Sequence, residues 1–156
     1  MTNALVITAP EGTPWIEFTR EFDAPVGALF NAHRDPDLVR RWLGPNGYEM
    51  AIDHYDFVSG GGYRYVHHAP DGGEYAFHGM FHTVREGEFA IQTFEFEGAP
   101  DQVAIEYLWF EDLGPGRSRL RGKSIGPSVE SRDAMVASGM EKGMREGYER
   151  LEALCA

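Results

Sequence analysis

The stretch SVESRDAMVASGMEKGMREGYERLEALCA, residues 128–156, decides how the rest of the chain must be arranged. Its apolar side chains recur every four positions, as Val136, Met140, Met144 and Tyr148. That spacing predicts one long helix from Val129 to Leu154, with these residues along a single stripe. The opposite face is charged, so we expect the stripe to lie against another part of the fold.

Three glycines, Gly139, Gly143 and Gly147, form a second row beside the apolar stripe. A glycine inside a helix costs about 1 kcal/mol relative to alanine, so three in register need a compensating contact. We expect this bare surface to let another backbone, or a ligand, approach the helix axis closely.

The composition indicates one globular domain, residues 1–156, with a net charge of −11. A charge of this sign repels phosphate backbones and anionic bilayers, so we expect no nucleic-acid partner. No apolar run approaches the roughly 20 residues that span a bilayer, so we expect no membrane insertion. The single cysteine, Cys155, and the lack of a basic-then-apolar leader favour a cytoplasmic protein.

The first third of the chain predicts one strand followed by two short helices. Residues 13–22 alternate between apolar and polar, as a half-buried antiparallel strand does. Residues 25–33 then carry apolar side chains at helical spacing behind a first-turn proline. Asp35 and Pro36 provide the N-cap and first turn of a second helix, which ends at Gly44.

The middle of the chain predicts a meander of further strands separated by glycine- and proline-rich turns. Six runs begin near Tyr48, Tyr63, Glu74, Glu88, Gln102 and Arg117. Such a sheet has one face in water, so its other face must cover something. The long C-terminal helix is the one amphipathic element left to be covered, which predicts an α+β fold.

Four segments carry a resemblance to a known family. They are FDAPVGALFNAHRDPDLVRRWLGPNGY (22–48), DFVSGGGYRYVHHAPDGGEYAFHGMF (56–81), QTFEFEG (92–98) and GMEKGMREGYERLEAL (139–154). Together they resemble the bacterial single-domain members of the Aha1-type family, named after the C-terminal domain of the activator of the Hsp90 ATPase. This family lies within the START-like, Bet v 1-like (SRPBCC) superfamily.

The resemblance implies a helix-grip fold, in which about seven antiparallel strands curve around the long C-terminal helix. Two short helices would follow the first strand. It also implies a cavity between the sheet and the helix, suited to a small hydrophobic or amphipathic molecule such as a lipid.

Strand parity and the resemblance together predict which side chains line that cavity. We expect ligand contacts from Trp42, Tyr63, Tyr65, His67, His78, Met80, His82, Phe94, Phe96, Phe110, Val136, Met140, Met144 and Tyr148. Both faces of the strand over residues 74–85 carry apolar side chains, so alternation leaves its orientation open. The face with the two histidines is favoured, because its continuation in Val84 matches an aliphatic position of the family. Trp42 would act as a lid.

The histidines also suggest a metal site, but their spacing argues against one. His78 and His82 share a strand face, yet four residues along a strand separate them by about 13 Å, too far for easy joint ligation. We therefore expect no metal and no cofactor. A histidine facing a half-polar cavity is a general base, a ligand hydrogen-bonding group or a core residue, and the last is the most common.

Three function classes remain open. The first is a noncatalytic module that binds a small hydrophobic molecule. The second is an enzyme like the polyketide cyclases and dehydratases of the superfamily, with Tyr65, His67 and His78 as acid and base. The third is a chaperone ATPase activator, as the family name suggests. A homodimer is also possible, through an edge strand or a face that includes Phe77 and Phe81.

Overall fold

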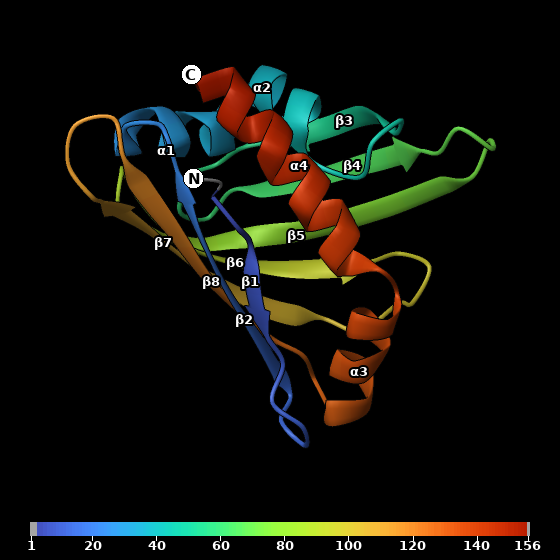
Figure 1. The fold of residues 1–156 in the computed structure, drawn as a ribbon. Helices are drawn as coiled ribbons and strands as arrows, with labels where there is room; N and C mark the ends of the chain where they lie inside the picture. The colour runs from blue at the N-terminus through green and yellow to red at the C-terminus, as the bar shows by residue number, and fades with distance from the viewer. Residues whose placement is uncertain (1–2, 156) are drawn as a thin grey trace.

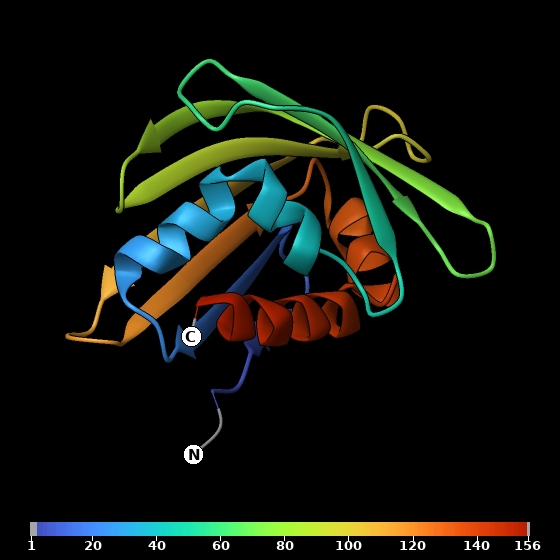
Figure 2. The same ribbon diagram turned by 90° about the horizontal axis from the view of Figure 1, so that it is seen from above.

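The computed structural model describes residues 3–155, in which eight antiparallel strands form one bent sheet with four helices on its concave side (Figure 1, Figure 2). The strands are β1 (Val6–Thr8), β2 (Trp15–Phe22), β3 (Glu49–Tyr55), β4 (Gly62–His68), β5 (Glu74–Arg85), β6 (Phe89–Phe96), β7 (Ala104–Asp112) and β8 (Ser118–Ile125). The helices are α1 (Val26–Arg34), α2 (Pro36–Trp42), α3 (Val129–Ala137) and α4 (Met140–Cys155). The predicted helix-grip architecture is confirmed.

The strand order across the sheet is β1-β2-β8-β7-β6-β5-β4-β3. The first long strand, β2, therefore pairs with the last strand, β8, and the meander from β3 to β8 completes the sheet. The register places Phe18 opposite Gly122 and Phe22 opposite Ser118. Both phenylalanines face the helices, as the alternation in residues 13–22 predicts.

Two features differ from the sequence prediction. The short edge strand β1 pairs with β2 and was not predicted, because three residues are too few to show a period. The predicted C-terminal helix is interrupted, because Gly139 adopts a left-handed conformation with φ of 85°. Ser128 caps the start of α3 by accepting a hydrogen bond from the Ser131 amide.

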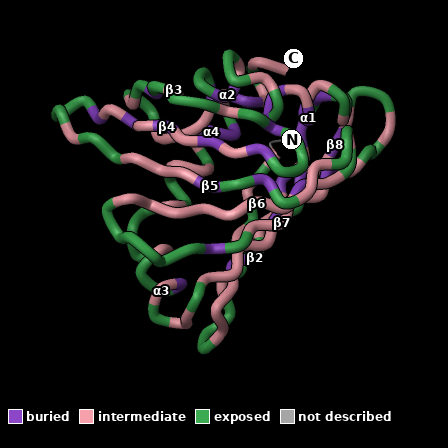
Figure 3. Tube along the Cα trace, turned by 180° about the vertical axis from the view of Figure 1, so that it is seen from behind, coloured by how far each residue is buried: buried purple, intermediate pink, exposed green. Residues whose placement is uncertain are grey.

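The buried core lies where α1, α2 and the C-terminal half of α4 meet the sheet, as the purple segments in Figure 3 show. Its largest fully buried side chains include Phe22, Leu29, Phe81, Leu120 and Leu151. Each contributes about 1.5–3 kcal/mol through removal of apolar surface from water. These contacts fix the helices on the sheet.

Helix α4 is attached to the connection between α2 and β3 by both packing and hydrogen bonds. Arg150 donates hydrogen bonds to the carbonyl oxygens of Trp42, at 2.9 Å, and of Gly44. A Cβ atom on Gly147 would lie 2.8 Å from the Trp42 carbonyl oxygen. Close backbone approach is therefore the reason for this glycine. Gly143 faces Pro45 less tightly, because a Cβ atom there would lie 3.4 Å from the ring, which is an ordinary contact.

Within residues 3–155, the helices are too short or too polar to cross a lipid bilayer.

Candidate functional site

The concave face of β5, β6 and β7 is less completely covered than the core beside it. Opposed residues of antiparallel strands point to the same side, so Gln92 on β6, Glu106 on β7 and Ser124 on β8 form one row across the sheet. Side chains of this face that stay half-buried are Phe77, Gln92, Phe94, Phe96, Glu106, Leu108 and Ser124. The tube of β6 is accordingly mostly pink in Figure 3.

Glu106 is the acidic side chain in the middle of this row. The Gln92 side-chain amide donates a hydrogen bond to its Oε1 at 3.1 Å. Burial disfavours the charged form and raises the pKa of Glu106 from 4.5 to about 7, while Ser124 and Gln92 oppose the shift. The Ser124 hydroxyl lies nearby but has no hydrogen-bond partner of normal geometry among the described residues. Glu106 therefore exchanges a proton near neutral pH.

Three tyrosines from two elements lie close enough to Glu106 for its charge to affect them. Tyr63 and Tyr65 belong to β4 and Tyr148 belongs to α4. Burial raises the pKa of all three phenols, and the negative charge of Glu106 raises each further. Tyr63 donates its hydroxyl hydrogen to the Thr93 carbonyl oxygen at 2.8 Å. The phenols are thus neutral polar groups beside a titratable carboxyl.

An aromatic panel continues this surface along β5 and β6. The Phe77 ring lies 5.3 Å from Phe94, 5.2 Å from Phe96 and 5.4 Å from Tyr65, measured between ring centroids. Met144 of α4 packs against the edge of the buried core. The arrangement combines apolar area with a few polar groups, as small-molecule sites do.

Comparison with known proteins establishes the family. Residues 23–156 match the sequence model described as "Activator of Hsp90 ATPase homolog 1-like protein". The chain belongs to this family. A search of curated proteins gave no match.

Solved structures place this family member in the helix-grip fold. A solution structure of a protein from Arthrobacter aurescens is 27% identical, with a TM-score of 0.86, over 96% of this chain and 90% of that chain. A crystal structure of a protein from Rhodobacter sphaeroides is 25% identical, with a TM-score of 0.86, over 97% of each chain. CalU16 from Micromonospora echinospora is 19% identical, with a TM-score of 0.61, over 99% of this chain and 74% of that chain, and shows the fold alone.

Several residues predicted for the cavity do point toward the helices. On β4, Tyr63, Tyr65 and His67 are buried, which confirms their inward orientation. Other predicted residues on this side are Phe94, Phe96, Phe110, Met140, Met144 and Tyr148, of which Phe110 and Tyr148 are buried and the rest half-buried. Their ligand contacts remain a prediction.

The predicted inward face of β5 is wrong. Met80 is 61% exposed, and His82 is exposed beside the Thr83 hydroxyl. His78 also lies on the outer face, where its Nδ1 is 2.9 Å from Glu97 Oε2. Apolar side chains on both faces made the alternation ambiguous. The structure resolves it in favour of the other face.

The inward residues of β5 are instead Phe77, Gly79 and Phe81. Phe81 is 1% exposed and lies 4.8 Å from the ring of Phe57. A Cβ atom on Gly79 would lie 2.7 Å from the Tyr63 hydroxyl oxygen, so only glycine fits there. Phe77 and Phe81 thus lie on the concave face and not on the outer surface, and a homodimer remains a prediction.

Two further predicted contacts lie elsewhere. Val136 is 45% exposed, because the break at Gly139 places it in α3 and off the stripe of α4. Trp42 is no lid: its indole N–H donates to the Ala32 carbonyl oxygen at 2.9 Å, and its ring stacks 5.8 Å from Tyr148. It is a fixed part of the core under the site.

His67 lies inside the fold but is uncharged at neutral pH. Its ring packs under Gly44, where a Cβ atom would come within 2.6 Å of Cε1. Burial, with the positive charge of Arg150, lowers the pKa of His67 to about 4. A neutral imidazole at the rim of the aromatic panel remains available as a hydrogen-bonding group.

Sequence reasoning missed the central acidic residue. Glu106 is absent from the predicted cavity residues, yet it shares strand parity with Leu108 and with Phe110, which is among them. Extending that alternation by two residues identifies it. A charged residue suggests an outward position, although the alternation of side chains along β7 places Glu106 inward.

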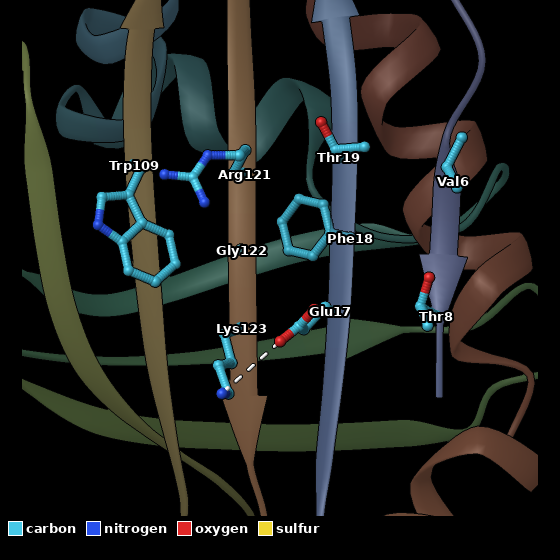
Figure 4. Close-up of a pocket in the computed structure, with 9 residues that line it drawn as sticks. All are labelled: Val6, Thr8, Glu17, Phe18, Thr19, Trp109, Arg121, Gly122 and Lys123. Atoms are coloured by element: carbon cyan, nitrogen blue, oxygen red, sulfur yellow. Dashed lines mark ion pairs between the residues drawn. The ribbon is translucent and has the colours of Figure 1, made fainter. Parts of the chain in front are cut away.

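A shallow pocket of about 400 Å³ lies on the opposite, outer face of β1, β2, β8 and β7 (Figure 4). Its lining residues are Val6, Thr8, Glu17, Phe18, Thr19, Trp109, Arg121, Gly122 and Lys123, of which Phe18 and Gly122 have the strand parity of the inner face. Lys123 pairs with Glu17 at 3.6 Å, and the Arg121 guanidinium stacks 4.7 Å from the Trp109 ring centre. Its charged groups are thus already engaged, and the sheet separates it from Glu106.

Over residues 3–155, no three histidine, cysteine, aspartate or glutamate side chains gather closely enough to hold a metal ion.

Proposed function

We propose that this protein binds a small, largely apolar molecule on its concave face, between α4 and strands β4 to β7. The observation that carries this proposal is the half-buried aromatic floor of β5 and β6 around an enclosed carboxyl, that of Glu106. Covering 100 Å² of apolar ligand surface would contribute about 2.5 kcal/mol. Glu106, Gln92 and the tyrosine hydroxyls would orient the polar end.

Family membership supports the same type of activity, because the curved sheet of a helix-grip fold can leave space between itself and the C-terminal helix. Here Phe94 lies on the concave face, beside Phe77, and stays half-buried. A ligand would complete the cover that the protein's own side chains leave partial.

Titration with the neutral apolar dye Nile red, read by its fluorescence, tests the proposal. Phe94→Ala should weaken binding about fivefold, since one ring contact contributes about 1 kcal/mol. The matched control is Tyr107→Ala, which removes a ring from the outer face of β7 and should leave the affinity unchanged. Equal effects of the two variants, or no dye binding by the folded protein, would count against a concave-face site.

An enzyme is the second candidate, and Glu106 favours it. A carboxyl with a pKa of about 7 is suited to accept and return protons at neutral pH. The acid and base pair would be Tyr65 and Glu106, with His67 nearby, since His78 lies on the outer face. Turnover of a polyketide-like substrate that is lost in Glu106→Gln, while ligand affinity is retained, would establish this reading over the passive module.

The net charge of the protein and the description of its family indicate which partners to test. A net charge of −11 supports a site for small molecules rather than nucleic acid, and we propose the cytoplasm as the compartment. Activation of a chaperone ATPase is a third candidate that rests on the family description alone. Measuring ATP hydrolysis by the cell's Hsp90 homologue with and without this protein tests it.

A further inference from the structure

The carboxyl of Glu106 has no positively charged partner among residues 3–155. Its polar neighbours are the Gln92 amide and the Ser124 hydroxyl, and burial is the main influence on its pKa. A carboxylate that is largely removed from water and has no counter-ion is disfavoured relative to its neutral form. The ionised form of Glu106 is therefore left without charge compensation by the described part of the chain.

The nearest inward cations are committed elsewhere. Arg20 is 4% exposed, pairs with Glu152 at 3.5 Å and donates to the Glu21 carbonyl oxygen at 3.1 Å. Arg150 donates to carbonyl oxygens of the α2–β3 connection. His67 is held neutral by burial. None of these side chains neutralises Glu106.

Aromatic rings share the concave face with this carboxyl, and three of them feel its charge. Tyr63 and Tyr65 come from β4, Tyr148 from α4, and Phe77 and Phe94 extend the surface. The face of an aromatic ring attracts a cation, most strongly when water is excluded. A carboxylate set among ring faces is complementary to an organic ammonium group and repels an anion.

The overall charge acts in the same direction. A net charge of −11 raises the local concentration of cations around the protein and lowers that of anions. Both the long-range field and the local contacts thus select the same sign of ligand.

We propose that the ligand of the concave face is an amphipathic organic cation, an amine or a quaternary ammonium with an apolar body, and that Glu106 is its counter-ion. This inference rests on the proposed function and specifies the chemical class of the ligand. The apolar body lies on the panel of Phe77 and Phe94, and the ammonium group lies among the tyrosine rings at Glu106.

Ionisation of Glu106 makes this binding depend on pH. The groups that face it are Gln92, Ser124 and three tyrosines that stay neutral, so Glu106 alone titrates there near pH 7. With a pKa of about 7, the ionised fraction rises about tenfold between pH 6 and pH 8. Affinity for a cation rises by about the same factor.

Calorimetric titration with three probes of one chain length tests the inference: octyltrimethylammonium, 1-octanol and octanoate. At pH 8 octyltrimethylammonium should bind at least about tenfold more tightly than 1-octanol or octanoate. Its own affinity should be about tenfold lower at pH 6 than at pH 8. Glu106→Gln should remove both the preference and the pH dependence. Glu17→Gln, which removes a carboxylate from the outer face of β2, should change neither.

The outcomes separate the two proposals. If all three probes bind alike and Glu106→Gln has no effect, or if octanoate binds best, the cation assignment is overturned while a concave-face site stands. If none of the probes and no Nile red binds to protein that is folded by circular dichroism, the proposed function itself is overturned.

Discussion

Replacing Glu106 by glutamine should stabilise the protein at pH 8 and leave its stability nearly unchanged at pH 4. In the folded protein burial raises the pKa of this carboxyl from 4.5 to about 7, so the folded state holds its proton more tightly than the unfolded state. The penalty is therefore absent below pH 4.5 and grows as the pH rises through about 7. Glutamine has nearly the same shape and no charge, so it avoids this penalty.

The magnitude follows from the shift. A change from 4.5 to about 7 corresponds to about 3 kcal/mol at 1.36 kcal/mol for each pH unit. We expect Glu106→Gln to gain about this free energy of unfolding at pH 8, and about half of it near pH 6. An enclosed carboxyl is the cause, so an exposed one should show no such effect.

Urea unfolding of the wild type and the variant at several pH values between 4 and 8, followed by circular dichroism, measures the difference directly. Taking the difference at each pH cancels the titration of all other groups. Glu17→Gln is the exposed control and should differ from the wild type by less than about 0.5 kcal/mol throughout. A stability difference for Glu106→Gln that stays constant from pH 5 to pH 8 would refute the enclosed carboxyl.

Three further predictions concern the scaffold around the site. Gly122→Ala places a Cβ atom against the Phe18 ring and should lower the free energy of unfolding in urea by about 2 kcal/mol. Gly27→Ala, which has open space on α1, should raise it by about 1 kcal/mol. Similar effects of the two variants would contradict the packing of Phe18 on Gly122. Arg150→Ala removes the hydrogen bonds that attach α4 to the α2–β3 connection and should lower the free energy of unfolding by about 2 kcal/mol. The exposed control Arg145→Ala should lower it by less than about 0.5 kcal/mol. Equal losses would be inconsistent with that attachment. Burial lowers the pKa of His33 from 6.5 to about 4, so its contribution to stability is present above pH 6.5 and should be lost as the pH falls through about 4. NMR of the ring nitrogens should show a neutral imidazole down to about pH 4. An inflection near pH 6.5 would contradict the burial of this ring.

The overall fold could be predicted from sequence because its signals are long and consistent. Alternation over residues 13–22 and helical spacing over residues 25–33 extend across several periods, and both elements form where predicted. The edge strand at Val6–Thr8 is too short to show a period. The break in the C-terminal helix depends on the left-handed backbone at Gly139, whereas Gly143 and Gly147 in the same row stay helical. Spacing alone does not distinguish the three glycines.

The candidate site was predicted less well, for a physical reason. The orientation of β5 depends on which of two apolar faces packs better, and Phe81 fills a space between Phe57 and Tyr63 that only the tertiary structure defines. Glu106 was missed for the opposite reason: its polarity suggested solvent, although its parity with Phe110 pointed inward.

The most direct test of a ligand site at Glu106 is a ¹³C NMR titration of its side-chain carboxyl in the free protein and with octyltrimethylammonium. We expect an inflection near pH 7 in the free protein, which moves to lower pH when the cation binds and stabilises the carboxylate. An inflection near pH 4.5 that the cation leaves unchanged would contradict it.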